Sequence, residues 1–200
     1  MVRRSILRAV ILLALGAGSA QAQNVLMNSA ETINKGNFKI AAFPTVLFAE
    51  GTGDNQFGLA SRFGYGFAHN FDVEAKLAFF DGLKLYGLDA EVWLAKGPAD
   101  VSVALGAHKT DLESGTDSKA IDASLLVSGH LTPRLELYGG LNMSFESLDN
   151  ADNTSFTRVY VVPGIEYKVA DDLDFLAEFG LGLNDDSPNY VSVGLAFYIR

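Results

Sequence analysis

The chain contains no cysteine and has few basic residues for its number of acids. Without cysteine it can form no disulfide, no thiolate metal site and no cysteine nucleophile. Its 15 lysines and arginines against 24 aspartates and glutamates give a formal net charge of −9 at pH 7. Such a chain would repel nucleic-acid phosphates, so nucleic acid is excluded as a partner.

Long hydrophobic runs are also missing after the N-terminal segment. A transmembrane helix needs about 20 predominantly apolar residues in a row, and no stretch beyond residue 22 supplies them. Hydrophobic residues still make up 48% of the chain, with 20 glycines and 14 phenylalanines. They alternate with polar residues at the two-residue period of a β-strand. Because a membrane-spanning strand needs only about 9–11 residues, the pattern favours an all-β transmembrane barrel.

Residues 1–22 have the features of a cleaved signal peptide. Arg3 and Arg4 form its positive region, the apolar core at 9–17 is too short to span a bilayer, and residues 20–22 fit an A-x-A cleavage site. The alternatives are a short membrane anchor and a loose twin-arginine signal, which would favour a soluble periplasmic protein. After cleavage we expect a polar periplasmic lead-in at 23–36 and a barrel domain at 37–200.

Ten alternating segments predict an antiparallel, up-and-down barrel of ten strands, or eight if two of them do not cross the membrane. The last segment would leave a row of backbone groups unpaired unless it joins the first strand and closes the barrel. Proline cannot donate to a ladder, so we expect a bulge at Pro44 and a distortion at Pro163. The predicted strands are 37–49, 57–67, 71–80, 84–95, 99–108, 120–131, 135–146, 156–168, 173–182 and 189–200.

The predicted connections alternate in length. Short turns at 68–70, 96–98, 132–134 and 169–172 alternate with mostly longer polar loops, the longest of them at 109–119. Bacterial outer-membrane barrels have short periplasmic turns and long external loops. An even number of strands then predicts that both termini lie in the periplasm.

Alternation alone does not decide which face meets lipid, and a soluble periplasmic β-barrel that binds an apolar ligand is the alternative. Aromatic residues at the strand ends of the apolar face favour the membrane, where two girdles flank the apolar band. Glycines on the opposite face suit a narrow interior better than a solvated surface. The expected girdle residues are Phe48, Phe57, Phe79, Tyr86, Phe145 and Tyr190 at one rim and Phe38, Phe67, Phe71, Tyr167, Phe175 and Phe197 at the other.

The pattern from Asn37 to Ile199 resembles the small outer-membrane β-barrel proteins of Gram-negative bacteria. The last segment, VSVGLAFYI at 191–199, is similar to the assembly signal of that class, although such signals typically end on an aromatic residue and this chain ends in Arg200. The resemblance implies outer-membrane lipid, lipopolysaccharide and the barrel assembly machinery as partners. It does not indicate an oligomeric state.

Charged residues on the inward face are the candidate functional residues. Buried charges must pair or be hydrated, so they either form a network in a structural barrel or line a narrow channel. Acids outnumber bases among them, so a channel would prefer cations. Those near the periplasmic mouth form either a cation-attracting ring or solvated charges with basic partners such as Lys168. The candidates are Arg62, Asp72, Glu74, Lys76, Asp89, Glu91, Asp100, Glu136, Arg158, Glu166, Asp174 and Glu178, of which Asp72, Asp100, Glu136 and Asp174 are the mouth acids.

Catalysis is not indicated by the sequence. Proteolytic and lipid-modifying barrels share the topology, but the chain has neither an Asp-x-His pair nor a His-x-Ser motif. His69 falls in a turn, and His108 and His130 fall on inward faces, where we interpret them as network members rather than metal ligands. We therefore expect no enzymatic activity, no cofactor and no metal.

Overall fold

The computed structural model describes residues 28–49, 54–113, 115–149 and 154–200. The predicted signal peptide at 1–22 lies outside these residues. Within the described ranges no helix is long and apolar enough to cross a membrane. The described residues form ten strands: β1 (Phe38–Leu47), β2 (Gln56–Ala68), β3 (Phe71–Phe80), β4 (Leu83–Ala95), β5 (Asp100–Leu112), β6 (Ser118–Thr132), β7 (Leu135–Leu148), β8 (Ser155–Ala170), β9 (Leu173–Gly182) and β10 (Tyr190–Ile199).

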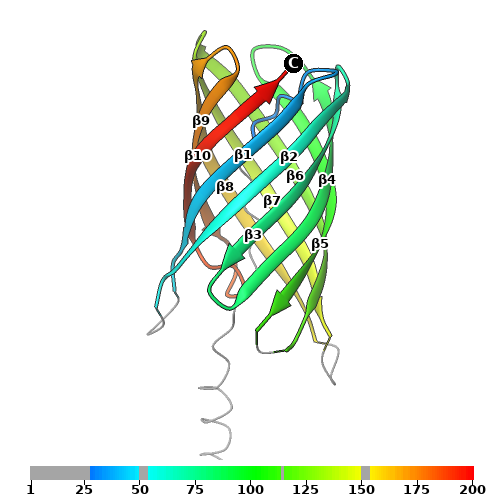
Figure 1. The fold of residues 1–200 in the computed structure, drawn as a ribbon, viewed down its shortest axis with the longest axis vertical. Helices are drawn as coiled ribbons and strands as arrows, with labels where there is room; N and C mark the ends of the chain where they lie inside the picture. Colours follow the sequence, from blue (N-terminus) through cyan, green and yellow to red (C-terminus); the bar gives the residue numbers. More distant parts are fainter. Residues whose placement is uncertain (1–27, 50–53, 114, 150–153) are drawn as a thin grey trace, which may run out of the picture.

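All ten strands belong to one closed antiparallel barrel in which each strand pairs with its sequence neighbours (Figure 1). β10 closes the barrel against β1, in a register that joins Phe38 to Ile199 and Leu47 to Tyr190. The predicted up-and-down topology, the count of ten and the closure are confirmed. The start of β1 and the C-terminus share the end that carries the short turns.

The prolines do not produce the predicted bulge. β1 keeps an unbroken register with β2 through Pro44, and its ladder with β10 only lacks pairs at residues 43 and 44. At Pro163 the ladder with β9 is interrupted in the same way, without a shift. The register shifts lie at the ends next to short turns, at 66/68, 93/95, 130/132 and 168/170. Proline therefore removes one hydrogen bond here without adding a residue to the strand.

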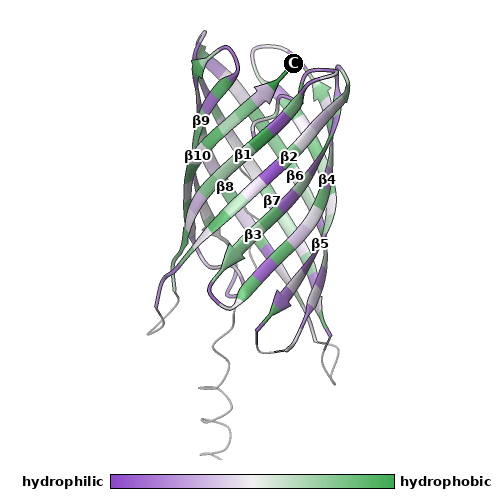
Figure 2. Ribbon diagram, viewed as in Figure 1, coloured by the Kyte–Doolittle hydropathy of each residue, from purple (hydrophilic) through white to green (hydrophobic). Residues whose placement is uncertain are grey.

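The outer face is apolar, and the inner face carries the polar and charged side chains. Outward residues such as Leu88, Leu105 and Ile121 are exposed, whereas the alternating Lys76, Asp89 and Asp122 are buried inside. Apolar residues recur along every strand in Figure 2. This distribution contradicts the alternative of a soluble barrel, because a band of large apolar side chains lies exposed on the outer face.

Two local predictions need correction. Tyr190 is buried inside the barrel rather than exposed in a girdle, because it shares the inward parity of Ser192 in β10. The loop predicted at 109–119 is shorter, since β5 extends to Leu112 and β6 begins at Ser118. The remaining girdle residues are exposed or half-buried; at one rim Phe38, Tyr65 and Phe67 form a run of ring contacts with centroids 4.7 and 4.8 Å apart.

Candidate functional site in the barrel interior

A continuous chain of ion pairs and hydrogen bonds crosses the interior. It begins at Lys39 of β1, whose Nζ lies 3.3 Å from Glu74 Oε1. Arg62 of β2 lies between Glu74, at 3.9 Å, and Asp89, at 3.1 Å. Asp89 of β4 also accepts a 2.6 Å bond from Lys76. These side chains alternate with outward apolar residues along their strands, so the two-residue period brings them together.

The chain of pairs continues across the opposite wall. Lys76 Nζ lies 2.7 Å from Asp122 Oδ2, which is 2.8 Å from His108 Nδ1. His108 Nε2 lies 3.9 Å from Glu146, and Glu146 lies 3.1 Å from Arg158 Nε. The whole network joins strands β1 to β8 and has four basic side chains for four carboxylates.

Sequence reasoning did not name Lys39, Asp122 or Glu146 as network members. Lys39 lies between the outward Phe38 and Ile40, so the two-residue period alone would have placed it inside. Its charge and that of Arg62, Lys76 and Arg158 balance the network carboxylates. The acid excess on which the predicted cation preference rested therefore lies outside this network.

The remaining predicted acids are held mainly by hydrogen bonds. Two tyrosine hydroxyls donate to Glu178, from Tyr138 at 3.1 Å and from Tyr190 at 2.7 Å. The backbone N–H of Gly97 donates to Asp100 at 3.1 Å. The structure does not bring Glu166 and Asp174 into the network; both line the mouth of the barrel.

The segment predicted as a periplasmic lead-in enters the barrel, which sequence reasoning missed. Residues 28–30, 32 and 33 are buried, and Glu31 is exposed toward the mouth. Asn28 accepts a 2.7 Å bond from Lys39 and donates a 2.5 Å bond to Glu91. The backbone N–H of Ala30 donates to Ser128 at 3.3 Å, and that of Ile33 donates to Asp72 at 2.6 Å. We call residues 28–34 the inner segment.

Two glycines of β2 make room for the inner segment. A Cβ on Gly64 would overlap the Ile33 side chain, and one on Gly66 would overlap the backbone oxygens of Ile33 and Asn34. Just beyond the segment, Gly36 N–H donates to Gly66 at 2.8 Å, and Gly66 N–H donates to Asn37 at 3.1 Å. The glycine-rich inner face predicted from the sequence thus accommodates a backbone as well as side chains.

Apolar and aromatic side chains fill the other part of the lumen. One buried cluster takes residues from nine strands and from Ala30 of the inner segment, and Leu112 of β5 packs against it. Phe43, Leu85 and Tyr160 in this cluster are 0%, 1% and 1% exposed. Within the described part of the chain, these side chains pack against one another and are almost fully shielded from solvent.

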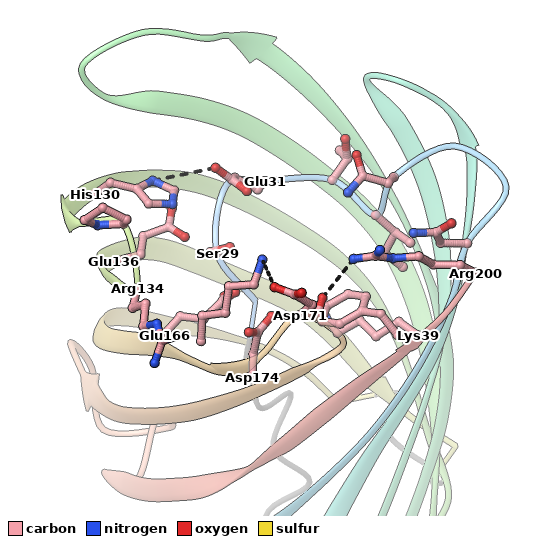
Figure 3. A pocket seen from close by; sticks show the side chains of 17 residues that line it. Ser29, Glu31, Lys39, His130, Arg134, Glu136, Glu166, Asp171, Asp174 and Arg200 are labelled. Carbon is pink, nitrogen blue, oxygen red and sulfur yellow. Dashed lines mark hydrogen bonds and ion pairs between the residues drawn. The ribbon is translucent and has the colours of Figure 1, made fainter.

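A cavity of about 200 Å³ opens at the end where β1 starts (Figure 3). It is lined by the inner segment and by the ends of several strands, with Glu31, His130 and Glu136 at one side and Glu166 and Asp174 at another. Burial raises the pKa of Glu31 above its usual value, and the nearby His130 opposes this shift. His130 is 47% exposed, so it belongs to the mouth and not to the buried inner wall.

Two groups of side chains among the described residues could hold a metal ion. Asp72, Glu74 and Glu91 converge in the buried interior. Glu31, Asp100, His130 and Glu136 converge at the mouth. Asp72, Asp100, Glu136 and Asp174 do not form the simple acidic ring considered from the sequence, because Asp72 is bonded to the inner segment and Asp174 lines another side of the cavity.

Comparison with known proteins identifies the family. A model of the outer membrane protein beta-barrel domain matches residues 10–197. No curated protein sequence matches the chain. Among solved structures, an outer membrane channel from Pseudomonas putida F1 is similar with a TM-score of 0.59 and 9% identity, over 88% of this chain and 100% of that one. The outer membrane protein OprG from Pseudomonas aeruginosa aligns with a TM-score of 0.40 and 17% identity, over 86% of this chain and 100% of that one.

The structural likeness concerns the fold, and the family match covers nearly the whole chain. Together with the closed barrel and its apolar outer face, the match places the protein in the bacterial outer membrane. The chain belongs to the outer membrane protein beta-barrel domain family.

Proposed function

We propose that this protein is a structural outer-membrane barrel whose lumen is closed by its own side chains and by the inner segment. The near-zero exposure of inward side chains such as Phe43, Leu85 and Tyr160 carries the proposal, because an open pore would leave them in contact with water. The balanced ion-pair network supports it as well. Unpaired buried charges are costly, whereas paired ones are tolerated in a dry interior.

Planar-bilayer recording of the refolded full chain tests this function. Insertion is first established by protease protection and by the shifted electrophoretic mobility of folded barrels. We expect inserted protein to pass no steady current at moderate voltage. Regular single-channel steps from the unmodified protein would overturn the proposal.

A narrow cation-preferring channel is the second candidate. It is favoured by buried acids with no ion pair within 4 Å among the described residues, including Asp72, Glu91 and Glu136. In a channel these acids would attract cations toward the mouth. Cation-selective steps that disappear in a variant combining Asp72→Asn and Glu91→Gln would establish this candidate instead of the closed barrel.

We propose no catalytic role. The Pseudomonas putida F1 protein is an outer membrane channel, which agrees with a non-enzymatic role, although the likeness concerns the fold alone. His108 lies between Asp122 and Glu146, and the His108 side chain is fully buried. A substrate has no access to it. Hydrolysis of peptide or lipid substrates by the refolded protein, lost in His108→Gln, would contradict this view.

We also propose an orientation and partners for the barrel. Short turns at the end that holds the start of β1 and the C-terminus support a periplasmic location of that end. The apolar outer face supports contact with outer-membrane lipid and lipopolysaccharide, and β10 supports recognition by the barrel assembly machinery. The orientation is tested by labelling the variant Lys119→Cys in whole cells with a reagent that does not cross the outer membrane. We expect labelling of intact cells; labelling only after the outer membrane is broken would mean that the barrel has the opposite orientation.

A further inference from the structure

Four side chains from four different elements converge beside the mouth cavity, and three of them, Glu31, His130 and Glu136, line it. The four are Glu31 of the inner segment, Asp100 of β5, His130 of β6 and Glu136 of β7. One potential ligand atom from each lies within 4.8 Å of every other. Atoms that bind one ion at about 2.0–2.2 Å lie no more than about 4.4 Å apart, so only a small contraction brings all four to a common centre.

Strand geometry brings the wall residues together. Glu136 lies opposite His130 in the β6–β7 ladder, next to a register shift between His130 and Thr132. A bulge re-aims the side chains beside it. Figure 3 shows Glu31, His130 and Glu136 gathered at the same side of the cavity.

The buried carboxylate of Glu136 points to a missing ligand. Glu136 is only 4% exposed, and its Oε1 has no hydrogen-bond partner among the described residues. A buried carboxylate oxygen without a partner is costly. His130 Nδ1 lies 3.7 Å from Glu31 Oε1, which is too long for a hydrogen bond. A cation between these groups would satisfy all of them.

We propose that Glu31, Asp100, His130 and Glu136 form a binding site for a divalent transition-metal ion such as Zn²⁺. One imidazole nitrogen with carboxylate oxygens is a donor set that suits zinc and related borderline ions, whereas Ca²⁺ and Mg²⁺ prefer oxygen ligands alone. His130 is half-exposed at the mouth, which gives an ion a path of entry from the solvent.

The site connects the inner segment to the wall. Glu31 lies on the inner segment, and the other three ligands lie on neighbouring strands. A bound ion therefore fastens the segment inside the barrel. This consequence rests on the proposed closed lumen, whereas metal binding itself does not.

Calorimetric titration of ZnCl₂ into the refolded, untagged full chain in detergent tests the site. We expect one ion per chain, and affinity that falls at least about tenfold in Glu136→Gln and in His130→Gln, since even loss of an outer partner of a metal ligand costs 10–100-fold. Asp174→Asn is the matched control, because it removes a mouth acid outside the cluster, and it should bind normally. Each variant must show the mobility shift of a folded barrel.

Titration with Co²⁺ supplies a second measurement. The absorption spectrum of bound cobalt reports on coordination directly, so a residue with a purely structural role would not change it. Visible absorption bands of coordinated cobalt should appear with the wild-type protein and be lost in Glu136→Gln. No saturable binding, or binding equal in wild type and both ligand variants, would overturn the site. If the inserted protein passed no current and bound no metal, the metal site would be wrong and the closed barrel would stand. If the protein conducted current and bound metal, the closed barrel would be wrong and the metal site would stand.

Discussion

Replacement of Lys76 by methionine should destabilise the barrel by about 3 kcal/mol, at the lower end of the range for breaking a buried ion pair. Lys76 Nζ bonds Asp89 at 2.6 Å and Asp122 at 2.7 Å, inside the lumen. Methionine is unbranched and only one atom shorter than lysine, so little cavity is created. Asp89 keeps Arg62 at 3.1 Å and Asp122 keeps His108 at 2.8 Å, which limits the cost.

Urea unfolding in lipid vesicles measures this effect, with the fluorescence of the single tryptophan, Trp93, as the signal. Lys119→Met is the matched control, since Lys119 lies 2.8 Å from Asp149 but the two side chains are 65% and 53% exposed. An exposed pair contributes about 0–1 kcal/mol. If Lys76→Met lowered the free energy of unfolding no more than Lys119→Met, the interior network would not stabilise the barrel.

Three further substitutions probe other parts of the interior and the outer face. Tyr190→Phe should cost about 1–3 kcal/mol in urea unfolding, because Glu178 loses a buried donor at 2.7 Å; no change would mean that this bond does not contribute. Gly180→Ala should destabilise more than Gly139→Ala, because its Cβ would overlap the Tyr190 ring, whereas at Gly139 the nearest atom is 3.9 Å away; equal unfolding free energies would contradict that packing. Leu125→Arg should cost about 2–4 kcal/mol on a lipid-facing strand, measured by folding into vesicles, and full tolerance would argue against the lipid contact.

The two-residue period was enough to predict the strands, their faces and the closure of the barrel. It works because a one-residue slip would turn every outward apolar side chain inward. The same period would also have placed Lys39 and Tyr190 inside. Tyr190 was assigned to a girdle from its position at a strand end, although its parity in β10 is that of Ser192.

The inner segment could not be predicted from a period. Residues 28–34 form no strand of the barrel and are held by partners far away in the sequence, such as Glu91 and Ser128. Their burial depends on long-range hydrogen bonds and on space beside Gly64 and Gly66. The mouth cluster was missed for the same reason, since Glu31 joins it only after the segment has entered the barrel.

Disulfide cross-linking tests the central claim, that the inner segment lies within the lumen. The chain has no cysteine of its own, so introduced pairs can be read without interference. Ala30→Cys combined with Ser128→Cys should form a disulfide on mild oxidation of the folded protein in vesicles, since Ala30 N–H bonds Ser128 Oγ at 3.3 Å. Ala30→Cys with Val127→Cys is the control, because Val127 is the neighbouring residue on the outer face. Efficient cross-linking of the first pair alone is the predicted result; equal or absent cross-linking in both pairs would contradict a segment that closes the barrel from within.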